Sequence, residues 1–337
     1  MPQDTHAPDL STSRIEATGR GRIALTSHAM PTQPLRPDEV EGVTIVSLVS
    51  PGTETNAIAS DDETPRATGY AAVFRITAKG SEVSDLEVGQ LVFCFGNHAG
   101  FQRVVARDVV AVPEGLDPAV AVFCRLMAVS WTTLVTTRAR PASRVLIMGL
   151  GLVGNLAAQI FRAAGYRVTA VDPVESRRDI ATSAGLPDVR ANVPDLGEYS
   201  RFTEESFGVF DLAVDCSGHE AAVLDAAKTL KRGGELVLVG VPWRRRTELS
   251  AHELLDVVFH HYITLRSGWE WELPLYPQAY SAGNLLGNHA GAMQWLAEGR
   301  VNVDGLAESA DPTDAQRIYD GLAASARLTA LFRWSEN

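Results

Sequence analysis

Three glycines at positions 149, 151 and 154 are the residues whose spacing most directly predicts a chemistry. They form the pattern G-x-G-x-x-G, which follows the apolar run 145–148 and opens a stretch of helical character. In a strand–loop–helix unit the first glycine allows a tight turn, the second lets a pyrophosphate approach the backbone, and the third lets helix and strand pack closely. The helix N-terminus offers unpaired N–H groups to the phosphates. We therefore predict a dinucleotide-binding loop made by Gly149, Gly151, Leu152, Val153 and Gly154.

Asp172 supplies the acid that such a loop requires. It follows the apolar run 167–171 and stands 18 residues after Gly154, where a carboxylate accepts hydrogen bonds from both hydroxyls of the cofactor ribose. A 2′-phosphate at that place would meet a like charge, so the sequence favours NAD over NADP. Arg177 and Arg178 leave an alternative open, since either side chain could turn toward a phosphate, although exposed positions on the next helix are the simpler interpretation.

The elements that position these residues alternate regularly. Apolar, strand-like runs occupy residues 145–148, 167–171, 210–218, 235–240 and 262–268, and helical stretches occupy residues 155–164, 176–185 and 219–234. This rhythm predicts an α/β fold with a parallel, doubly wound sheet. Ligands bind at the carboxyl ends of the strands in such a sheet. We therefore expect Ser217, Gly218 and Gly240 to line the nicotinamide half of the cofactor site.

The remaining sequence predicts a second domain. Residues from about 20 to 125 are rich in Val, Thr, Gly and Pro, with frequent turn signals, which is typical of a β-rich domain of short strands. A chain of 337 residues suits two domains. We predict a flexible segment at residues 1–20, a β-rich catalytic domain at residues 21–125 and 275–337, and a dinucleotide-binding domain at residues 126–274.

Composition and charge argue against several classes of protein. The net charge of −11 is unfavourable for nucleic-acid binding, because phosphate contacts need a basic surface. No run approaches about 18 uninterrupted apolar residues, and the N-terminus lacks the apolar core of a signal peptide, so we expect no membrane segment. Cys94, Cys124 and Cys216 are scattered and form no C-x-x-C pair, which indicates buried thiols in a reducing cytoplasm and no structural zinc site.

Several blocks of the sequence resemble the medium-chain dehydrogenase/reductase superfamily. They are VSPGTE (49–54), TGY (68–70), LEVGQLVFCFGNHAGF (86–101), VPEGLDPAVAVF (112–123) and GLGLVG (149–154), and the resemblance extends from about residue 40 to the end. It implies a Rossmann domain joined to a GroES-like catalytic domain. It also implies a homodimer in which Rossmann edge strands meet across a two-fold axis, with the region from about Ile263 to Leu285 in the contact.

The chain departs from this superfamily at the metal-binding positions. Zinc-dependent members carry Gly-His-Glu where this sequence has Gly69-Tyr70-Ala71, a cysteine near positions 50–51, and four cysteines after the turn at positions 88–89; all of these are absent here. The S-x-G-T-E pattern followed by Gly-Tyr resembles the zinc-free branch that includes the bacteriochlorophyllide dehydrogenases. The resemblance therefore implies a protein that binds no zinc.

Three residues near the lost ligand are candidates for the proton chemistry. Without a metal, a general base must take the hydroxyl proton of an alcohol while hydride leaves for the nicotinamide. Thr53 aligns with the hydroxyl residue that begins the family's proton relay, Glu54 follows it as an orienting group or base, and Tyr70 takes the place of the histidine. Simpler roles stay open: a turn for Thr53, an ion pair with an arginine for Glu54, and space filling for Tyr70.

Four further residues are candidate substrate contacts. His98 lies in a turn where the family often has H-A-E or H-A-G, and a structural role is its alternative. Arg125 falls near the last zinc-ligand region, where a cation could bind an oxyanion or pair with Glu54. Trp269 and Trp271 alternate with acids in a segment that approaches the family's cleft. Aromatic faces beside carboxylates suit a polyhydroxylated or amine-bearing ring, with core or dimer packing as the alternative.

Together these features predict a zinc-independent, NAD-dependent dehydrogenase with a small-molecule substrate. The expected reaction oxidises a secondary alcohol of a polar ring metabolite, such as a sugar, cyclitol or aminoglycoside-like compound, to a ketone. The alternative is a reductase acting on a carbonyl or activated alkene in secondary metabolism, although Asp172 argues mildly against the NADPH that such enzymes usually take. A third possibility is an NAD-binding protein without activity, which the intact Thr53 and Glu54 argue against.

Overall fold

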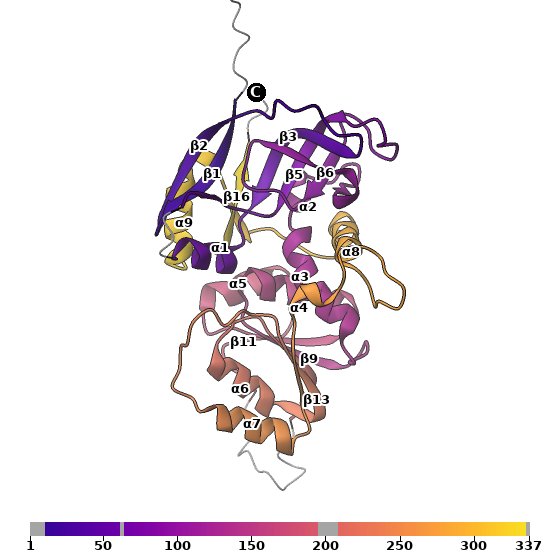
Figure 1. The fold of residues 1–337 in the computed structure, drawn as a ribbon. Coiled ribbons are helices and arrows are strands. Elements are labelled where there is room, and N and C mark those ends of the chain that lie inside the picture. The colour runs from indigo at the N-terminus through magenta and orange to yellow at the C-terminus, as the bar shows by residue number, and fades with distance from the viewer. Residues whose placement is uncertain (1–10, 61–63, 195–207, 335–337) are drawn as a thin grey trace, which may run out of the picture. The chain divides into compact units, whose positions relative to one another are not determined.

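The chain folds into two compact units. The computed structural model describes residues 11–60, 64–194 and 208–334 (Figure 1). The first unit consists of residues 1–123 and 307–337, and the second consists of residues 124–306. The first unit contains two sheets and the second unit contains one, and each unit has hydrophobic core residues of its own.

A six-stranded sheet forms the centre of the second unit. Its strands are β9 (Arg144–Met148), β10 (Arg167–Val171), β11 (Val189–Arg190), β12 (Phe210–Asp215), β13 (Leu230–Leu238) and β14 (Thr264–Ser267). Their order is β11-β10-β9-β12-β13-β14, and all neighbouring pairs are parallel. The order reverses between β9 and β12, as in a doubly wound Rossmann sheet. The predicted parallel sheet is confirmed.

Helices connect the strands of this sheet. They are α4 (Leu152–Ala163), α5 (Glu175–Ser183), α6 (Glu220–Lys228) and α7 (Ala251–His260). From Val145 to Met148, β9 is buried, because it pairs with strands on both edges and helices pack on the sheet. The predicted helix 219–234 is shorter in the structure. It ends at Lys228, and Leu230 already pairs with Phe210 in the sheet, ahead of a register shift.

One long apolar helical stretch occurs among the described residues. It runs from Pro118 to Thr136 and consists of α2 (Pro118–Ala121) and α3 (Cys124–Thr136). By length and composition alone this stretch could cross a membrane, although Arg125 interrupts its apolar sequence. However, 67% of its most apolar window is buried inside the protein. Within the second unit α3 packs against α4 and α8 (Leu285–Ala297), as a core helix does.

The first unit is rich in strands. They are β1 (Ser11–Gly19), β2 (Arg22–Ala29), β3 (Glu39–Leu48), β4 (Arg66–Ala67), β5 (Ala72–Lys79), β6 (Leu91–Cys94), β7 (Phe101–Val105), β8 (Val110–Ala111), β15 (Ala307–Ala310) and β16 (Thr329–Arg333). One sheet has the order β15-β16-β3-β5-β6-β8, with β7 also paired to β3, and the other has the order β2-β1-β4. Helix α1 (Pro51–Ile58) follows β3 and contacts α9 (Ala315–Ala323), which precedes β16. The predicted GroES-like, β-rich domain is confirmed.

The limits of the first unit differ from the predicted domain limits. Residues 11–19, expected to be flexible, form β1, because Ile15 and Ala17 on one face of the strand are buried in the core of this unit. Residues 1–10 of that predicted segment lie outside the described residues. At the other end, the chain returns to the first unit at residue 307 and not at 275, since α8 packs on α3 of the second unit.

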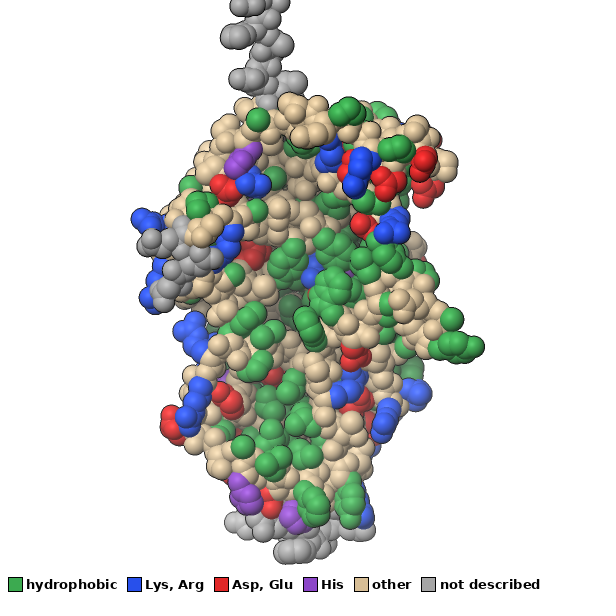
Figure 2. Space-filling model, viewed as in Figure 1, with side chains coloured by type: hydrophobic (Ala, Val, Ile, Leu, Met, Phe, Trp, Pro, Cys, Tyr) green, Lys and Arg blue, Asp and Glu red, His purple; other side chains and the backbone are tan. Residues whose placement is uncertain are grey.

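The surface carries both signs of charge. Figure 2 shows acidic and basic side chains interspersed on the face in view, with hydrophobic side chains between them. The net charge of −11 is therefore not gathered into one acidic field on that face. Large hydrophobic side chains that are well exposed include Phe259 at 76% and Tyr262 at 63%, both in or just after α7.

Candidate functional site

The glycine loop between β9 and α4 has the shape of a phosphate cradle. Gly149 has φ of +87°, a left-handed conformation that glycine adopts without strain. A Cβ added at Gly154 would lie 1.8 Å from the Gly149 carbonyl oxygen, so only glycine allows this approach of helix to strand. A Cβ at Gly151, by contrast, would meet no atom within 4 Å. The second glycine thus borders open space where α4 begins, which fits a pyrophosphate at the helix N-terminus.

Asp172 at the end of β10 is built into this loop. It is 1% exposed, and its two carboxylate oxygens accept hydrogen bonds from the Leu150 N–H at 2.7 Å and the Val174 N–H at 2.8 Å. Arg177 Nη1 lies 3.4 Å from the oxygen that Leu150 uses, while Arg178 donates to backbone carbonyls. The carboxylate therefore orders the glycine loop. Oδ1 keeps a further lone pair with which it can accept from a ligand, whereas Oδ2 already accepts from both Leu150 and Arg177.

The turns that end β12 and β13 pack tightly on one another. Gly218 has φ of +62°, and a Cβ on it would lie 2.5 Å from the Val241 carbonyl oxygen; a Cβ on Gly240 would lie 2.3 Å from the Gly218 nitrogen. Asp215 holds the first turn by accepting from the Ser217 hydroxyl at 2.5 Å. Burial raises the pKa of Asp215, against the lowering effect of its hydrogen bonds. A cavity of about 300 Å³ opens beside these turns and is also lined by α6 and α7.

A buried polar cluster in the first unit contains Glu54. The hydroxyl of Tyr319 on α9 donates to Glu54 Oε2 at 2.5 Å, and His98 Nε2 lies 3.2 Å from the same oxygen. The Ser50 N–H donates to Glu54 Oε1 at 2.6 Å, which ties the carboxylate to the start of α1. Glu54 is 5% exposed and His98 is fully buried. Three donors thus satisfy a carboxylate that would be costly to bury alone.

The hydrogen bonds of His98 can be assigned a direction. Trp334 Nε1, which can only donate, lies 3.0 Å from Ser47 Oγ, so the serine accepts from it and can turn its own hydrogen toward His98 Nδ1 at 2.8 Å. His98 Nδ1 then accepts, and Nε2 carries the hydrogen that Glu54 receives. We assign these directions because they give every group in the chain of hydrogen bonds a partner.

Tyr319 is the member of this cluster that the sequence does not reveal. It stands 265 positions from Glu54 and meets it only because α9 packs against α1. Burial raises its pKa well above the ordinary value for tyrosine, and the Glu54 charge, their hydrogen bond and the nearby Tyr70 raise it further. Tyr319 therefore remains a donor at neutral pH. The pattern of apolar residues in α9 predicts a buried face but no partner for the phenol.

Thr53 and Tyr70 border this cluster: Thr53 precedes Glu54 in the sequence, and Tyr70 lies near Tyr319. Thr53 lies in the first turn of α1, is half-buried, and makes no hydrogen bond through its hydroxyl to the residues that the structure describes. Tyr70 is half-buried and near enough to Tyr319 to raise its pKa. Gly69 before it has φ of +84°, and a Cβ there would lie 2.6 Å from the His98 ring. The glycine lets the turn that carries Tyr70 pass directly over the buried imidazole.

Arg125 forms a buried ion pair within the second unit. Its guanidinium binds both carboxylate oxygens of Glu270, at 2.9 and 2.6 Å, and both residues are 5% exposed. Burial, and secondly the charge of Arg125, lowers the pKa of His289 to about 3, so this imidazole stays neutral. Glu270 is thus the carboxylate partner of Arg125. The neighbouring Trp269 and Trp271 are 68% and 48% exposed, although Glu270 between them is buried.

The side chains of the described residues do not fit a zinc ion. Among residues 11–60, 64–194 and 208–334, no group of three or more His, Cys, Asp or Glu side chains is arranged to hold a metal. Zinc binds the thiolate form of cysteine. Burial raises the pKa of Cys94 to about 12 and raises those of Cys124 and Cys216 as well. Tyr70 itself offers a phenol where a zinc-dependent relative would offer an imidazole.

Comparison with known proteins places this geometry in a known fold. Residues 153–269 match the family described as "zinc-binding dehydrogenase". An alcohol dehydrogenase of Geobacillus stearothermophilus is 32% identical over 149 residues, which is 44% of this chain and 43% of that protein. The match thus spans less than half the length of this curated relative.

Solved structures match over nearly the whole chain. Galactitol-1-phosphate dehydrogenase from Escherichia coli superposes with a TM-score of 0.78 at 19% identity, covering 95% of this chain and 99% of that one. A Sinorhizobium meliloti protein described as a zinc-binding dehydrogenase bound to NADP gives 0.77 at 18% identity, with 96% and 99% covered. Acetophenone reductase from Geotrichum candidum in complex with NAD gives 0.75 at 17% identity, with 97% and 98% covered.

The chain shares the fold of these dehydrogenase structures, as the resemblance to the medium-chain dehydrogenase/reductase superfamily implies. Part of the sequence supports the resemblance to that superfamily, through residues 153–269 and the match to the alcohol dehydrogenase. The fold of nearly the whole chain supports it as well. Two of the matches are described as zinc-binding, so membership of the zinc-free branch is not supported by them and stays a prediction. The roles of the candidate site residues likewise stay predictions.

Proposed function

We propose that the protein is an NAD-dependent dehydrogenase that oxidises a secondary alcohol of a polar ring metabolite to a ketone without zinc. The observation that carries this proposal is the glycine cradle with Asp172 bound to its backbone. The fold supports it, as do matches to an alcohol dehydrogenase and to the structure of a sugar-alcohol phosphate dehydrogenase. When bound, a nicotinamide cofactor supplies the acceptor for the hydride.

The residues around Asp172 support NAD over NADP. Its carboxylate is fixed by two backbone N–H groups, so it cannot swing away from a cofactor ribose. A 2′-phosphate would meet this charge at close range. Arg177 already contacts Asp172, at 3.4 Å, and would have to leave it to bind a phosphate. The S. meliloti structure holds NADP and the G. candidum structure holds NAD, so the fold accommodates either cofactor, and the role of the acid at position 172 is what this proposal tests.

In this proposal Thr53 and Tyr70 handle the proton of the alcohol, and Glu54 orients them. The Thr53 hydroxyl has no hydrogen bond within the described residues and is half-buried, which suits a group that binds substrate. Glu54 accepts three hydrogen bonds from protein groups, which suits a positioning role better than that of a free base. Through the Ser50 N–H it fixes the turn of α1 that carries Thr53.

The four candidate substrate contacts also divide into groups that position other residues and groups that touch the substrate. His98 uses both ring nitrogens in the buried cluster, and Arg125 uses two guanidinium nitrogens on Glu270. These two residues therefore enter the proposal as groups that hold others in place. The exposed Trp269 and Trp271 remain the aromatic faces on which a polar ring could stack.

A homodimer is part of the proposal. β14 is the last strand in the order of its sheet, so one of its edges lacks a partner strand among the described residues. An open edge of this kind is a template for pairing with a second copy. Light scattering at micromolar concentration should give the mass of a dimer, and a monomer mass would contradict this part of the proposal.

Cofactor titration tests the proposed function. NADH and NADPH are titrated into the wild type and Asp172→Ala, and binding is followed by calorimetry. The wild type should bind NADH more tightly than NADPH, and the substitution should shrink that ratio because it removes the charge that repels a 2′-phosphate. Tighter binding of NADPH by the wild type would favour the reductase alternative, and no binding of either cofactor would overturn both.

A further inference from the structure

A second pocket in the second unit is lined by arginines and lies away from the glycine loop. Its volume is about 560 Å³, within the range of small-molecule sites. Arg144 is the first residue of β9, Arg167 is the first residue of β10, and Phe210 is the first residue of β12. The pocket thus lies at the amino ends of the strands, whereas the glycine loop follows the carboxyl end of β9. The five residues of β9 separate the two places.

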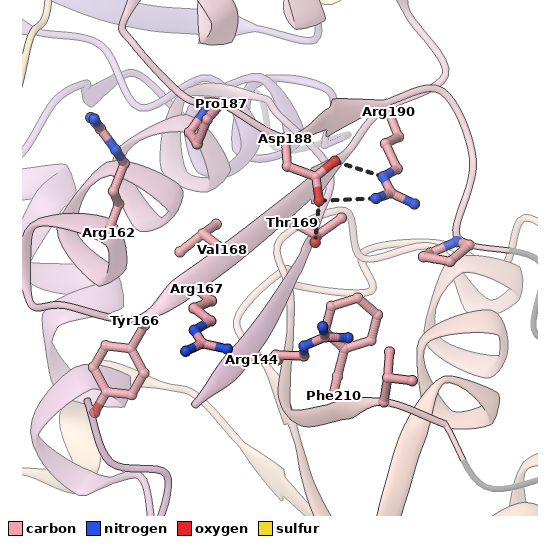
Figure 3. A pocket seen from close by; sticks show the side chains of 12 residues that line it. Arg144, Arg162, Tyr166, Arg167, Val168, Thr169, Pro187, Asp188, Arg190 and Phe210 are labelled. Atoms are coloured by element: carbon pink, nitrogen blue, oxygen red, sulfur yellow. Dashed lines mark hydrogen bonds and ion pairs between the residues drawn. The ribbon is translucent and has the colours of Figure 1, made fainter. Parts of the chain in front are cut away.

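Four arginines surround this pocket, and three of them make no side-chain hydrogen bond or ion pair with the described part of the chain. Arg190 binds both oxygens of Asp188, at 2.6 and 3.1 Å, and is neutralised by it (Figure 3). Arg144, Arg162 and Arg167 line the same pocket without a carboxylate of their own. They leave a local excess of positive charge on a chain whose net charge is −11. The three side chains are exposed, and such an excess of positive charge favours the binding of an anion.

Two of these arginines, Arg144 and Arg167, lie side by side on neighbouring strands. Arg144 and Arg167 are register partners on neighbouring parallel strands, and Figure 3 shows their side chains next to each other. The backbones of neighbouring strands are about 4.8 Å apart, so the two exposed guanidinium groups can lie close together and repel each other. Asp188 cannot relieve this repulsion, because its oxygens already bind Arg190 and the Thr169 hydroxyl. The cationic groups of this pair would be stabilised by an anion that bridges them.

The rest of the lining suits an organic body attached to such an anion. Val168 and Phe210 are buried, and together with Pro187 they give the pocket an apolar part of its lining. Guanidinium groups bind phosphate and carboxylate through pairs of parallel hydrogen bonds. We propose that this pocket binds a small organic polyanion carrying at least two phosphate or carboxylate groups, which bridges Arg144 and Arg167. This proposal is independent of the proposed dehydrogenase activity.

The test measures stabilisation by two probes, inorganic tripolyphosphate and citrate, which separate phosphate from carboxylate recognition. Thermal unfolding of the full chain is followed against probe concentration, with ionic strength held constant by sodium chloride. Arg144→Gln and Arg167→Gln remove one cation each, and Arg244→Gln is the matched control because Arg244 is also exposed and belongs to the second unit. The glycine loop is another candidate phosphate site, so the comparison between variants decides the outcome.

We expect at least one probe to raise Tm in the wild type and in Arg244→Gln. In Arg144→Gln and Arg167→Gln the apparent Kd should rise about tenfold or more, since a hydrogen bond to a charged group is lost. Without probe, these two variants should unfold at the same temperature as the wild type or higher, because the repulsion is relieved. Equal stabilisation of all four proteins, or of none, would overturn the proposal.

A lower Tm of both variants without probe would also overturn it. That result would mean that the arginines bind groups of the protein itself. Residues 195–207, outside the described residues, include Asp195, Glu198, Glu204 and Glu205 and connect two lining residues, Pro194 and Val209. Such a result would name these acids as the candidate partners of the arginines.

Discussion

Replacing Tyr319 by phenylalanine isolates one hydrogen bond of the buried cluster. The ring stays, so no cavity forms, and only the hydroxyl that donates to Glu54 at 2.5 Å is lost. Both residues are buried, at 3% and 5% exposed, so water cannot easily replace the donor. A hydrogen bond to a charged group contributes about 1.5–3 kcal/mol. We expect Tyr319→Phe to lower the free energy of unfolding by that amount at pH 7.

Urea denaturation measures this loss against a control in the same unit. Thr329→Val removes a buried hydroxyl that donates to the Val49 carbonyl at 2.6 Å, so it deletes a neutral hydrogen bond with little change of shape. Its expected cost is about 0.5–1.5 kcal/mol. The difference between the two variants reports the charge on Glu54. A loss in Tyr319→Phe no larger than in Thr329→Val would refute the ionised, hydrogen-bonded carboxylate at the centre of the cluster.

The same hypothesis predicts the direction in which the contribution of Tyr319 to stability changes with pH. The pKa of Tyr319 is raised in the folded protein, so its contribution to stability is fully present below the unfolded pKa of about 10. Above that pH the unfolded chain releases the proton first, and the contribution falls by up to about 1.4 kcal/mol per pH unit. The stability difference between wild type and Tyr319→Phe should therefore shrink above pH 10. A difference that grows with pH would contradict this assignment.

Three other predictions follow from single contacts. Gly154→Ala should destabilise the second unit by about 1–3 kcal/mol and weaken NADH binding in titration, because its Cβ would lie 1.8 Å from a carbonyl oxygen of the loop. Arg125→Met should cost about 3–5 kcal/mol in urea unfolding, since it leaves Glu270 buried and unpaired, whereas adding Glu270→Leu should recover most of the loss. Cys94 and Cys124 should resist a thiol reagent at pH 8 until the protein unfolds, because burial raises their pKa values; fast labelling in the native state would contradict this.

Local patterns made much of the fold predictable. The apolar run 145–148, the glycine spacing and Asp172 all lie within one strand–loop–helix unit, so their geometry depends mainly on neighbours in sequence. The end of α6 was harder to predict, because no Gly or Pro directly follows Lys228, and Leu230 belongs to β13 only through its pairing with Phe210. The strand at Ser11–Gly19 was missed for a similar reason, since its burial depends on residues from the far end of the chain.

The polar sites were predictable only in part. The sequence identified Glu54, His98 and Arg125 as residues of interest but not their partners. Glu270 and Tyr319 lie 145 and 265 positions from the residues they bind, and no periodicity in the sequence links such distant positions. The cost of burying a charge requires that a partner exist, but only tertiary packing decides which residue it is. The arginine pocket has the same origin, because strand register brings Arg144 beside Arg167.

The measurement that tests the central claim most directly combines metal content with turnover. The purified protein is dialysed against a strong chelator, its zinc is determined by elemental analysis, and reduction of NAD is followed at saturating cofactor with a panel of sugar and cyclitol alcohols. The proposal predicts zinc far below one ion per chain and an oxidation rate that neither the chelator nor added zinc changes. About one tightly held zinc per chain, or turnover that is lost on chelation and restored by zinc, would contradict it.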